Sequence, residues 1–396
     1  MNGFIVITGS EFVDGIKPER NSLYIAQESL KRDIDINGIL IVPDDIYRIE
    51  QAVRFALDKS DIVFITGGMG ATSDDITREA VQEAIGVQFI YDKEWLEKLK
   101  NEAKQTGKEI TDSLKKLAKI PYGSAKIENP VGKALGFLKV LENKVIIGLP
   151  GVPSELKAML PIVFEKLQLT NVHKNIHLFR TFGLSEIEID NILSDIKNIH
   201  LNPSPKGVDI FIKDKNQESL IKKIQIIRER LNTYIYAEDN IEMEEVVGNL
   251  LKKYRKTIAT AESSTGGLIV SRLINVPGSS QYVLGGITAY SNQVKINLLK
   301  VNGNDLKKHG AVSEVVAKQM VEGLRALINA DFCLSDTGIA GPTGATKEKP
   351  LGLHYIGFCT EDKIEVHKVI FKGERNDVRI KVSQYALNLI RLYYQK

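Results

Sequence analysis

A lysine in the last third of the chain stands where its amine could act as a base. Lys295 falls in the first turn of the helix expected over 292–300, directly after the polar stretch 289–292. The positive end of the helix dipole disfavours an ammonium there and would lower its pKa. Such a lysine can take the proton of a serine hydroxyl and turn that serine into a nucleophile. A solvated lysine that merely tolerates the position is the alternative.

Loops rich in hydroxyls and glycine surround this lysine in the expected fold. The run 261–267 lies between a strand and a helix, and the loop 336–342 follows an apolar strand. Backbone amides and hydroxyls in such loops can hold an anion. Arg375 follows another strand and suits a bidentate contact with phosphate, although a surface salt bridge or a place at the start of a helix would also explain it. These loops predict an anion-binding site where strands end at one edge of a sheet.

The N-terminal third carries a separate glycine loop. Residues 66–75 follow the strand expected over 61–66, and glycines there let backbone amides approach a phosphate. Asp74 and Asp75 are hard oxygen ligands that could hold a divalent cation, or one of them could cap the helix that begins near residue 76. The turn 149–155 and Asp44 follow neighbouring strands and should lie at the same edge.

Alternating strands and helices must position these loops. The apolar, β-branched strands expected in the N-terminal third are 3–8, 38–43 and 61–66, and the helices between them are 21–35 and 46–60. This βαβαβ order predicts an α/β fold with a doubly wound, three-layer N-terminal domain. The stretch 171–240 has no glycine cluster and predicts a small α+β module. After it, alternating helices and strands predict a further α/β domain. The expected domains are 1–168, 169–240 and 241–396.

Composition excludes several classes of protein. The 396 residues carry 53 Lys and Arg against 50 Asp and Glu, and a net charge of +3 is too small to indicate nucleic-acid binding. No apolar run is long enough to cross a membrane, and the first residues do not read as a signal peptide, so a cytoplasmic protein is expected. The two cysteines, Cys333 and Cys359, cannot form a disulfide framework, and the six histidines show no zinc spacing.

The N-terminal motifs resemble a known family. TGGMGATSDDIT (66–77), NPVGKALGF (129–137) and LPGVPSEL (149–156) are similar to the molybdopterin-binding-type domain of the competence/damage-inducible protein A (CinA) family. In that family the domain is associated with metal-dependent ADP-ribose pyrophosphatase activity. The resemblance implies Mg²⁺ or Co²⁺ at Asp44, Asp74 and Asp75. The nucleotide-binding residues that it implies are Glu11, Asn21, Gly67, Gly68, Gly70, Thr72, Gly151 and Ser154.

The C-terminal motifs closely resemble the second domain of the same family, known as a nicotinamide mononucleotide (NMN) deamidase. They are AESSTGG (261–267), PGSS (277–280), YSNQVK (290–295), HGAVSE (309–314), TGIAGPTG (337–344) and EKPLG (348–352). The resemblance implies that Ser280 is the nucleophile and Lys295 its base, fifteen residues apart, with no cofactor for deamidation. The substrate-binding residues that it implies are Ser263, Thr265, Gly266, Tyr290, Asn292, Thr337, Gly338 and Arg375.

The middle stretch also fits this family, because residues 182–186 resemble the opening of its KH-like domain. The resemblance therefore implies a homodimeric amidohydrolase that converts NMN and water to nicotinic acid mononucleotide and ammonia. A second activity in the N-terminal domain would cleave ADP-ribose, and both reactions recycle parts of NAD. The alternative is that the N-terminal domain binds a nucleotide or pterin without catalysis, or serves in dimerisation.

Overall fold

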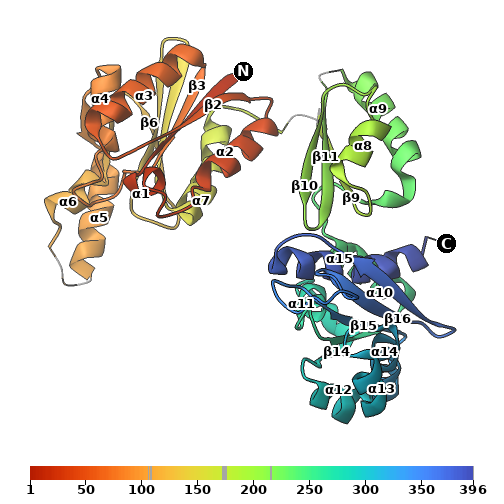
Figure 1. Ribbon diagram of the computed structural model, residues 1–396. Coiled ribbons are helices and arrows are strands. Elements are labelled where there is room, and N and C mark those ends of the chain that lie inside the picture. Colours follow the sequence, from red (N-terminus) through yellow and green to blue (C-terminus); the bar gives the residue numbers. More distant parts are fainter. Residues whose placement is uncertain (106, 108, 172–175, 215, 396) are drawn as a thin grey trace. The chain divides into compact units, whose positions relative to one another are not determined.

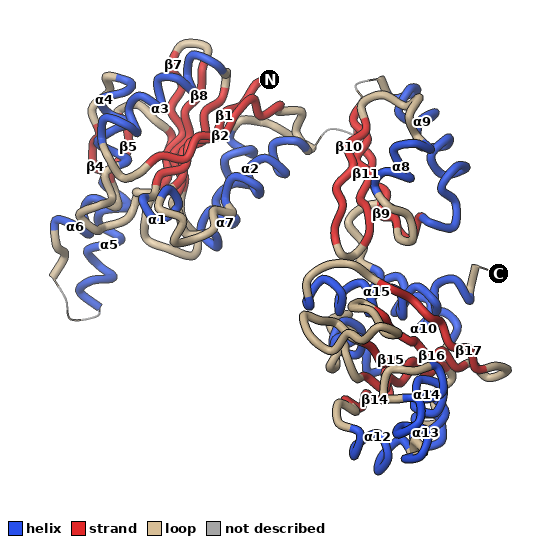
Figure 2. The backbone as a smooth tube through the Cα atoms, in the orientation of Figure 1, coloured by secondary structure: helices blue, strands red, loops and turns tan. Residues whose placement is uncertain are grey.

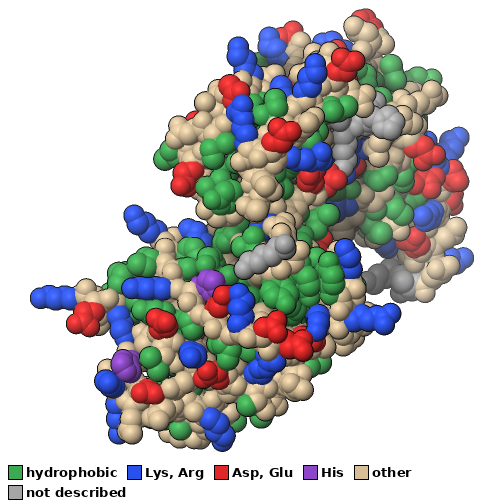
Figure 3. Space-filling view, turned by 90° about the vertical axis from the view of Figure 1, so that its right-hand side faces the viewer, with side chains coloured by type: hydrophobic (Ala, Val, Ile, Leu, Met, Phe, Trp, Pro, Cys, Tyr) green, Lys and Arg blue, Asp and Glu red, His purple; other side chains and the backbone are tan. Residues whose placement is uncertain are grey.

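The computed structural model describes all residues except 106, 108, 172–175, 215 and 396 (Figure 1). The chain divides into two compact units, residues 1–174 and residues 175–396. Across the described residues, no helix combines the length and the apolarity needed to cross a membrane. Lys and Arg side chains are interspersed with Asp and Glu on the face drawn in Figure 3, in keeping with the small net charge.

The first unit is built on a six-stranded sheet in the order β2-β1-β3-β8-β7-β6 (Figure 2). The strands β2, β1, β3 and β8 are parallel, whereas β7 and β6 run antiparallel at one side. Their bounds are β1 Asn2–Thr8, β2 Asp35–Val42, β3 Ile62–Thr66, β6 Ala125–Ile127, β7 Gly136–Leu141 and β8 Lys144–Leu149. All five residues of β3 are buried, because helices cover both faces of the sheet. The doubly wound, three-layer expectation is confirmed for this unit.

Two apolar cores lie on the two faces of this sheet. One joins the sheet to α3, α4 and α5, and the other joins it to α2 and α7. Asp45 caps α3 by accepting a hydrogen bond from the Arg48 amide. A short antiparallel pair, β4 (Phe89–Tyr91) with β5 (Lys119–Pro121), forms a separate two-stranded sheet, with α5 and α6 between its strands in the chain. The helices are α1 Ser10–Val13, α2 Asn21–Leu30, α3 Ile46–Lys59, α4 Thr77–Ile85, α5 Lys93–Gln105, α6 Asp112–Lys116 and α7 Pro153–Lys166.

The second unit contains a five-stranded sheet in the order β14-β13-β15-β16-β17. The strands β14, β13 and β15 are parallel, so their carboxyl ends meet at one edge, and β16 and β17 complete the sheet antiparallel. The bounds are β13 Ile258–Glu262, β14 Val283–Thr288, β15 Phe332–Gly338, β16 Leu353–Cys359 and β17 Ile364–Ile370. The two cysteines are free and buried, as the apolar runs around them predict.

Helices cover both faces of the five-stranded sheet. One apolar core includes α10, α11 and α15, and the other includes α12, α13 and α14. Ser313 caps α14 through the Val316 amide, and Ser291 caps α12 through the Val294 amide. The helix α13 ends at His309, directly before Gly310. The bounds are α10 Met243–Tyr254, α11 Leu268–Ile274, α12 Asn292–Leu299, α13 Gly303–His309, α14 Glu314–Leu327 and α15 Arg375–Tyr393.

The module expected over 171–240 forms a four-stranded antiparallel sheet in the order β10-β11-β9-β12. Helices α8 (Glu186–Ile192) and α9 (Gln217–Leu231) share an apolar core with it. Ser185 and Glu188 form a capping box at the start of α8. The strands are β9 Ile176–Thr181, β10 Ile199–Ser204, β11 Gly207–Lys213 and β12 Ile235–Glu238.

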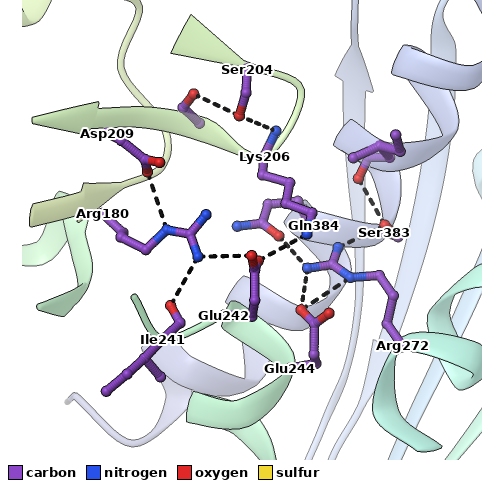
Figure 4. A network of polar contacts seen from close by, with 12 residues as sticks. Arg180, Ser204, Lys206, Asp209, Ile241, Glu242, Glu244, Arg272, Ser383 and Gln384 are labelled. Atoms are coloured by element: carbon purple, nitrogen blue, oxygen red, sulfur yellow. Dashed lines mark hydrogen bonds and ion pairs between the residues drawn. The ribbon is translucent and has the colours of Figure 1, made fainter. Parts of the chain in front are cut away.

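This module is joined to the five-stranded domain through ion pairs and hydrogen bonds. Arg180 and Lys206 of the module both pair with Glu242, which stands at the N-cap of α10 (Figure 4). The buried Arg391 of α15 also donates to the carbonyls of residues 233 and 235. Both therefore belong to one compact unit, although each has its own sheet.

Candidate active site

The amine of Lys295 meets a serine hydroxyl in the second unit. Its Nζ lies 2.9 Å from Ser263 Oγ and also contacts the carbonyl oxygens of Ala289 at 2.6 Å and Tyr290 at 3.0 Å. Lys295 lies in the first turn of α12, as the sequence predicts, and only 1% of the residue is exposed. Burial lowers the pKa of Lys295, and the charge of Asp336 partly opposes that shift. A neutral amine here can accept the proton that Ser263 donates.

The loop that carries Ser263 leaves β13 at its carboxyl end and leads into α11. Gly266 has a φ of 64° and Gly267 a φ of 93°, in the left-handed region that glycine adopts without strain. Two buried carboxylates, Glu262 and Asp336, accept hydrogen bonds from this stretch. The serine is therefore held on a compact turn between a strand and a helix.

A cavity of about 450 Å³ opens beside the Ser263–Lys295 pair. Thr337 and Gly338 line it from the end of β15, and Arg375 lines it from the start of α15. Arg375 Nη1 donates to the carbonyl of Gly341 at 2.7 Å, which ties α15 to the loop after β15. Tyr290 also lines the cavity and is 65% exposed. The structure thus brings Ser263, Tyr290, Lys295, Thr337, Gly338 and Arg375 to one cavity, as the sequence predicts.

The expected pairing of Ser280 with Lys295 is wrong for the folded chain. Ser280 lies in a short 3-10 helix before β14, whereas Lys295 follows the end of that strand. The six residues of β14 span roughly 20 Å, so the two residues lie at opposite ends of it. Ser280 is exposed and does not line the cavity. The physical reason is that the whole of β14 lies between Ser280 and Lys295 in the chain and holds them apart.

Three other expected binding residues do not line the cavity either. Thr265 is fully buried, and its hydroxyl contacts Glu262 and Asp336. Gly266 supplies the turn, and Asn292 is exposed at the start of α12. These residues shape the loops behind the site.

The first unit has its own cavity, of about 650 Å³, where β1, β3 and β8 end. This edge is a topological switch point, because β2 and β3 lie on opposite sides of β1. Gly67 has a φ of 106°, and a side chain there would collide with the Thr8 carbonyl. The predicted residues that line the cavity are Glu11, Gly67, Gly68, Gly70, Thr72 and Gly151.

Two predicted residues of this domain lie elsewhere. Asn21 lines a smaller neighbouring cavity of about 310 Å³ and donates to the Gly151 carbonyl at 2.8 Å, so it positions that turn. Ser154 lines neither cavity and lies in the first turn of α7.

The predicted metal ligands line the first unit's cavity without forming a metal centre. Asp44 accepts from the Ser10 amide at 2.8 Å, and Asp75 accepts from the amide and hydroxyl of Thr72. Among the residues that the structure describes, no three His, Cys, Asp or Glu groups converge to hold a metal. Asp44, Asp74 and Asp75 nevertheless line one cavity, and a divalent cation at them stays a prediction. The capping alternative is wrong, because Ile76 stands at the N-cap of α4 and no side chain caps that helix.

Models of two protein families match the chain. The one described as "CinA C-terminal domain" matches residues 240–394, and "Probable molybdopterin binding domain" matches residues 4–168. A "CinA-like protein" of a Sulfurihydrogenibium species is 58% identical over 395 residues, which cover 99% of both chains. The chain belongs to the CinA family.

Another relative and a solved structure are more distantly similar to this chain. A "CinA-like protein" of Thermotoga maritima is 35% identical and covers 98% of this chain and 97% of its own. A crystal structure titled as the competence/damage inducible protein CihA of Agrobacterium tumefaciens is 32% identical, with a TM-score of 0.38. The match covers 39% of this chain and 94% of that one.

Sequence reasoning missed several residues that build the two sites of this CinA family member. Arg78 is almost fully buried and donates to the carbonyls of Met69, Lys119 and Leu135, so it fixes two loops of the N-terminal cavity. Burial lowers the pKa of Arg78 to about 10. Its spacing of three from the buried Val81 is the signal that places it on the inner face of α4. Lys349 lines the C-terminal cavity, and only its position in a motif pointed to it.

Proposed function

We propose that the C-terminal site of this protein hydrolyses NMN to nicotinic acid mononucleotide and ammonia, with Ser263 as the nucleophile and Lys295 as its base. The observation that carries the proposal is the 2.9 Å contact between Ser263 Oγ and a lysine amine that burial favours in its neutral form. This is the arrangement that a serine needs in order to attack an amide without a histidine.

The reaction runs in two halves. Lys295 takes the hydroxyl proton while Ser263 Oγ bonds to the carboxamide carbon, and the resulting tetrahedral intermediate collapses to an ester. The leaving amino group takes that proton from Lys295 and departs as ammonia. Water then attacks the ester with Lys295 again as the base, and the released carboxylate product restores the serine.

The developing oxyanion needs donors that are not already engaged. The amides of Ser263 and Ser264 donate to Asp336 and are not free for this role. The loop 339–344, which lines the same cavity, is therefore the source that we propose. Arg375 would hold the 5′-phosphate of the nucleotide, and the chemistry asks for no cofactor.

The test is ammonia release from NMN by the full chain, with Ser263→Ala and Ser280→Ala as matched variants. We expect loss of activity in Ser263→Ala alone. Normal turnover by Ser263→Ala would overturn the assignment of the nucleophile, and no ammonia from the wild type would overturn the function.

A second function is favoured by the cavity of about 650 Å³ at the switch point of the first unit. We propose that its glycine loops bind a phosphate-bearing nucleotide such as ADP-ribose. Cleavage of the pyrophosphate would need a divalent cation that these carboxylates do not assemble by themselves. Calorimetric titration with ADP-ribose, followed by an assay for AMP with and without Mg²⁺ or Co²⁺, separates a binding module from a pyrophosphatase.

A further inference from the structure

Asp336 is a fully buried carboxylate directly behind the serine loop. Its oxygens accept from the amides of Ser263 at 3.0 Å, Ser264 at 2.9 Å and Thr265 at 3.3 Å. The hydroxyls of Ser264 and Thr265 contact the same carboxylate. Three consecutive backbone amides and the Ser264 hydroxyl therefore converge on one side chain of the neighbouring strand β15, and the Thr265 hydroxyl is shared between it and Glu262.

This arrangement fixes the backbone from which Ser263 projects. A buried carboxylate without donors is very costly, so the loop and Asp336 must keep this geometry together. The nearby Glu262 has a different task, because it accepts from the amides of Ile269 and Val270 at the start of α11. Asp336 is thus the group that sets the position of the serine itself.

The same carboxylate acts on the amine of Lys295. Burial favours the neutral amine, and the negative charge of Asp336 favours the ammonium. The other titratable or charged groups around this amine are Tyr290, Lys349 and Arg375 on the cavity wall. Behind the loop, Glu262 lies on β13 and the buried His354 lies on β16. The charge of Asp336 acts to raise the pKa of His354, against the larger effect of burial, which lowers it.

We infer that Asp336 is a positioning residue for the deamidation: it holds the Ser263 loop in register with Lys295. The inference rests on the proposed function of the C-terminal site. Asp336 does not touch the substrate cavity, so it acts through Ser263 and Lys295.

Two substitutions separate position from charge. Asp336→Asn removes the charge and replaces one accepting oxygen by an amide nitrogen that cannot accept from the loop. We therefore expect kcat to fall and its rising limb against pH to move to lower pH, because the ammonium of Lys295 loses its counter-charge. Asp336→Glu keeps the charge but displaces the loop, so we expect kcat to fall by roughly 10²-fold with no such movement of the limb. A purely structural role would lower the amount of folded protein without moving the limb.

Asp331→Asn is the matched control. Asp331 precedes the same strand and accepts from the amide and the hydroxyl of Thr257, both at 2.8 Å, at the opposite end of the β13–β15 pair. It should lower the melting temperature and leave kcat and the pH profile unchanged. If Asp336→Asn behaves like this control, the inference is overturned.

A second readout keeps the inference independent of the substrate. Labelling of Ser263 by a small sulfonyl fluoride, followed by mass spectrometry across pH, reports the nucleophile directly in the full chain. If the wild type releases no ammonia but Ser263 is labelled, and Asp336→Asn shifts the pH dependence of labelling downward, the deamidase proposal fails and the role of Asp336 stands. Equal labelling profiles, or no labelling of wild-type Ser263 at any pH, would overturn that role.

Discussion

The two cavities of this protein occupy the same place in two α/β sheets and differ in what lines them. Each lies where parallel strands end, and each is bordered by a loop with glycines in the left-handed region. The C-terminal cavity adds a lysine amine that is 1% exposed and lies 2.9 Å from a serine oxygen. In the N-terminal cavity the carboxylate of Asp44 accepts a hydrogen bond from the Ser10 amide, and that of Asp75 accepts one from the Thr72 amide of its own loop.

This difference separates ligand binding from chemistry. Glycine loops at strand ends supply amides and space for a phosphate, and both units have them. A chemical step needs in addition a group whose pKa the protein has shifted, and burial lowers the pKa of Lys295. The predictions below test that division, from the largest expected effect to the smallest.

Removing the nucleophile or its base should have the largest effect. If Ser263 and Lys295 act as one catalytic unit, then Ser263→Ala, Lys295→Ala and the double variant should all fall to a similar residual kcat, ~10²–10⁴-fold below the wild type. Steady-state ammonia release from NMN measures this. Ser280→Ala is the matched control and should stay near the wild-type rate, since its hydroxyl is exposed and outside the cavity. Additive losses in the double variant would contradict a single unit.

The dependence of kcat on pH should report the deprotonation of Lys295. Its folded pKa is lowered by burial, so kcat should rise with pH through a value below that of an exposed lysine. Lys295→Arg should be as inactive as Lys295→Ala, because a guanidinium keeps its proton at any working pH. A rising limb that persists unchanged in Lys295→Arg would show that another group is the base.

Phosphate recognition should give a smaller and more selective effect. Arg375→Ala should raise KM for NMN by roughly 10- to 150-fold, the equivalent of a charge-assisted hydrogen bond, and should barely change the kinetics with nicotinamide riboside, which has no phosphate. Lys347→Ala is the control, because Lys347 is exposed on a nearby loop and does not line the cavity. Equal losses on both substrates would mean that Arg375 only holds the Gly341 loop.

A substitution in the N-terminal glycine loop should change ADP-ribose binding without any effect on deamidation. Asp75 accepts from the amide of Thr72 at 2.8 Å, and any side chain at Gly70 would collide with it, so Asp75→Ala should loosen this loop. We expect weaker binding of ADP-ribose by calorimetry and loss of any cleavage, with kcat for NMN unchanged. Loss of NMN deamidation in a folded Asp75→Ala variant would contradict two independent sites.

The sequence by itself predicted the loops that line the two cavities and the lysine that lies at one of them. Glycines that follow apolar strands indicate the loops of both cavities. These signals can be found in the sequence because backbone freedom and strand periodicity are properties of short segments. The position of Lys295 in the first turn of α12 was also readable, since Ser291 caps that helix and the cap is a local signal. Motifs along nearly the whole length of the chain indicated its family.

Only the tertiary structure decided which serine faces that lysine. Ser263 is thirty-two residues from Lys295 and Ser280 is fifteen, yet the nearer one in sequence lies across the full length of β14. Pairing of β13 with β14 in register brings the end of one strand beside the end of the other, with Glu262 opposite Thr288. The roles of Asp336 and Arg78 depend on the same long-range pairing, because their partners lie on other strands and loops. Spacing along a chain does not measure distance in space once a strand intervenes, and burial, which shifts the pKa of Lys295, exists only after the sheet has formed.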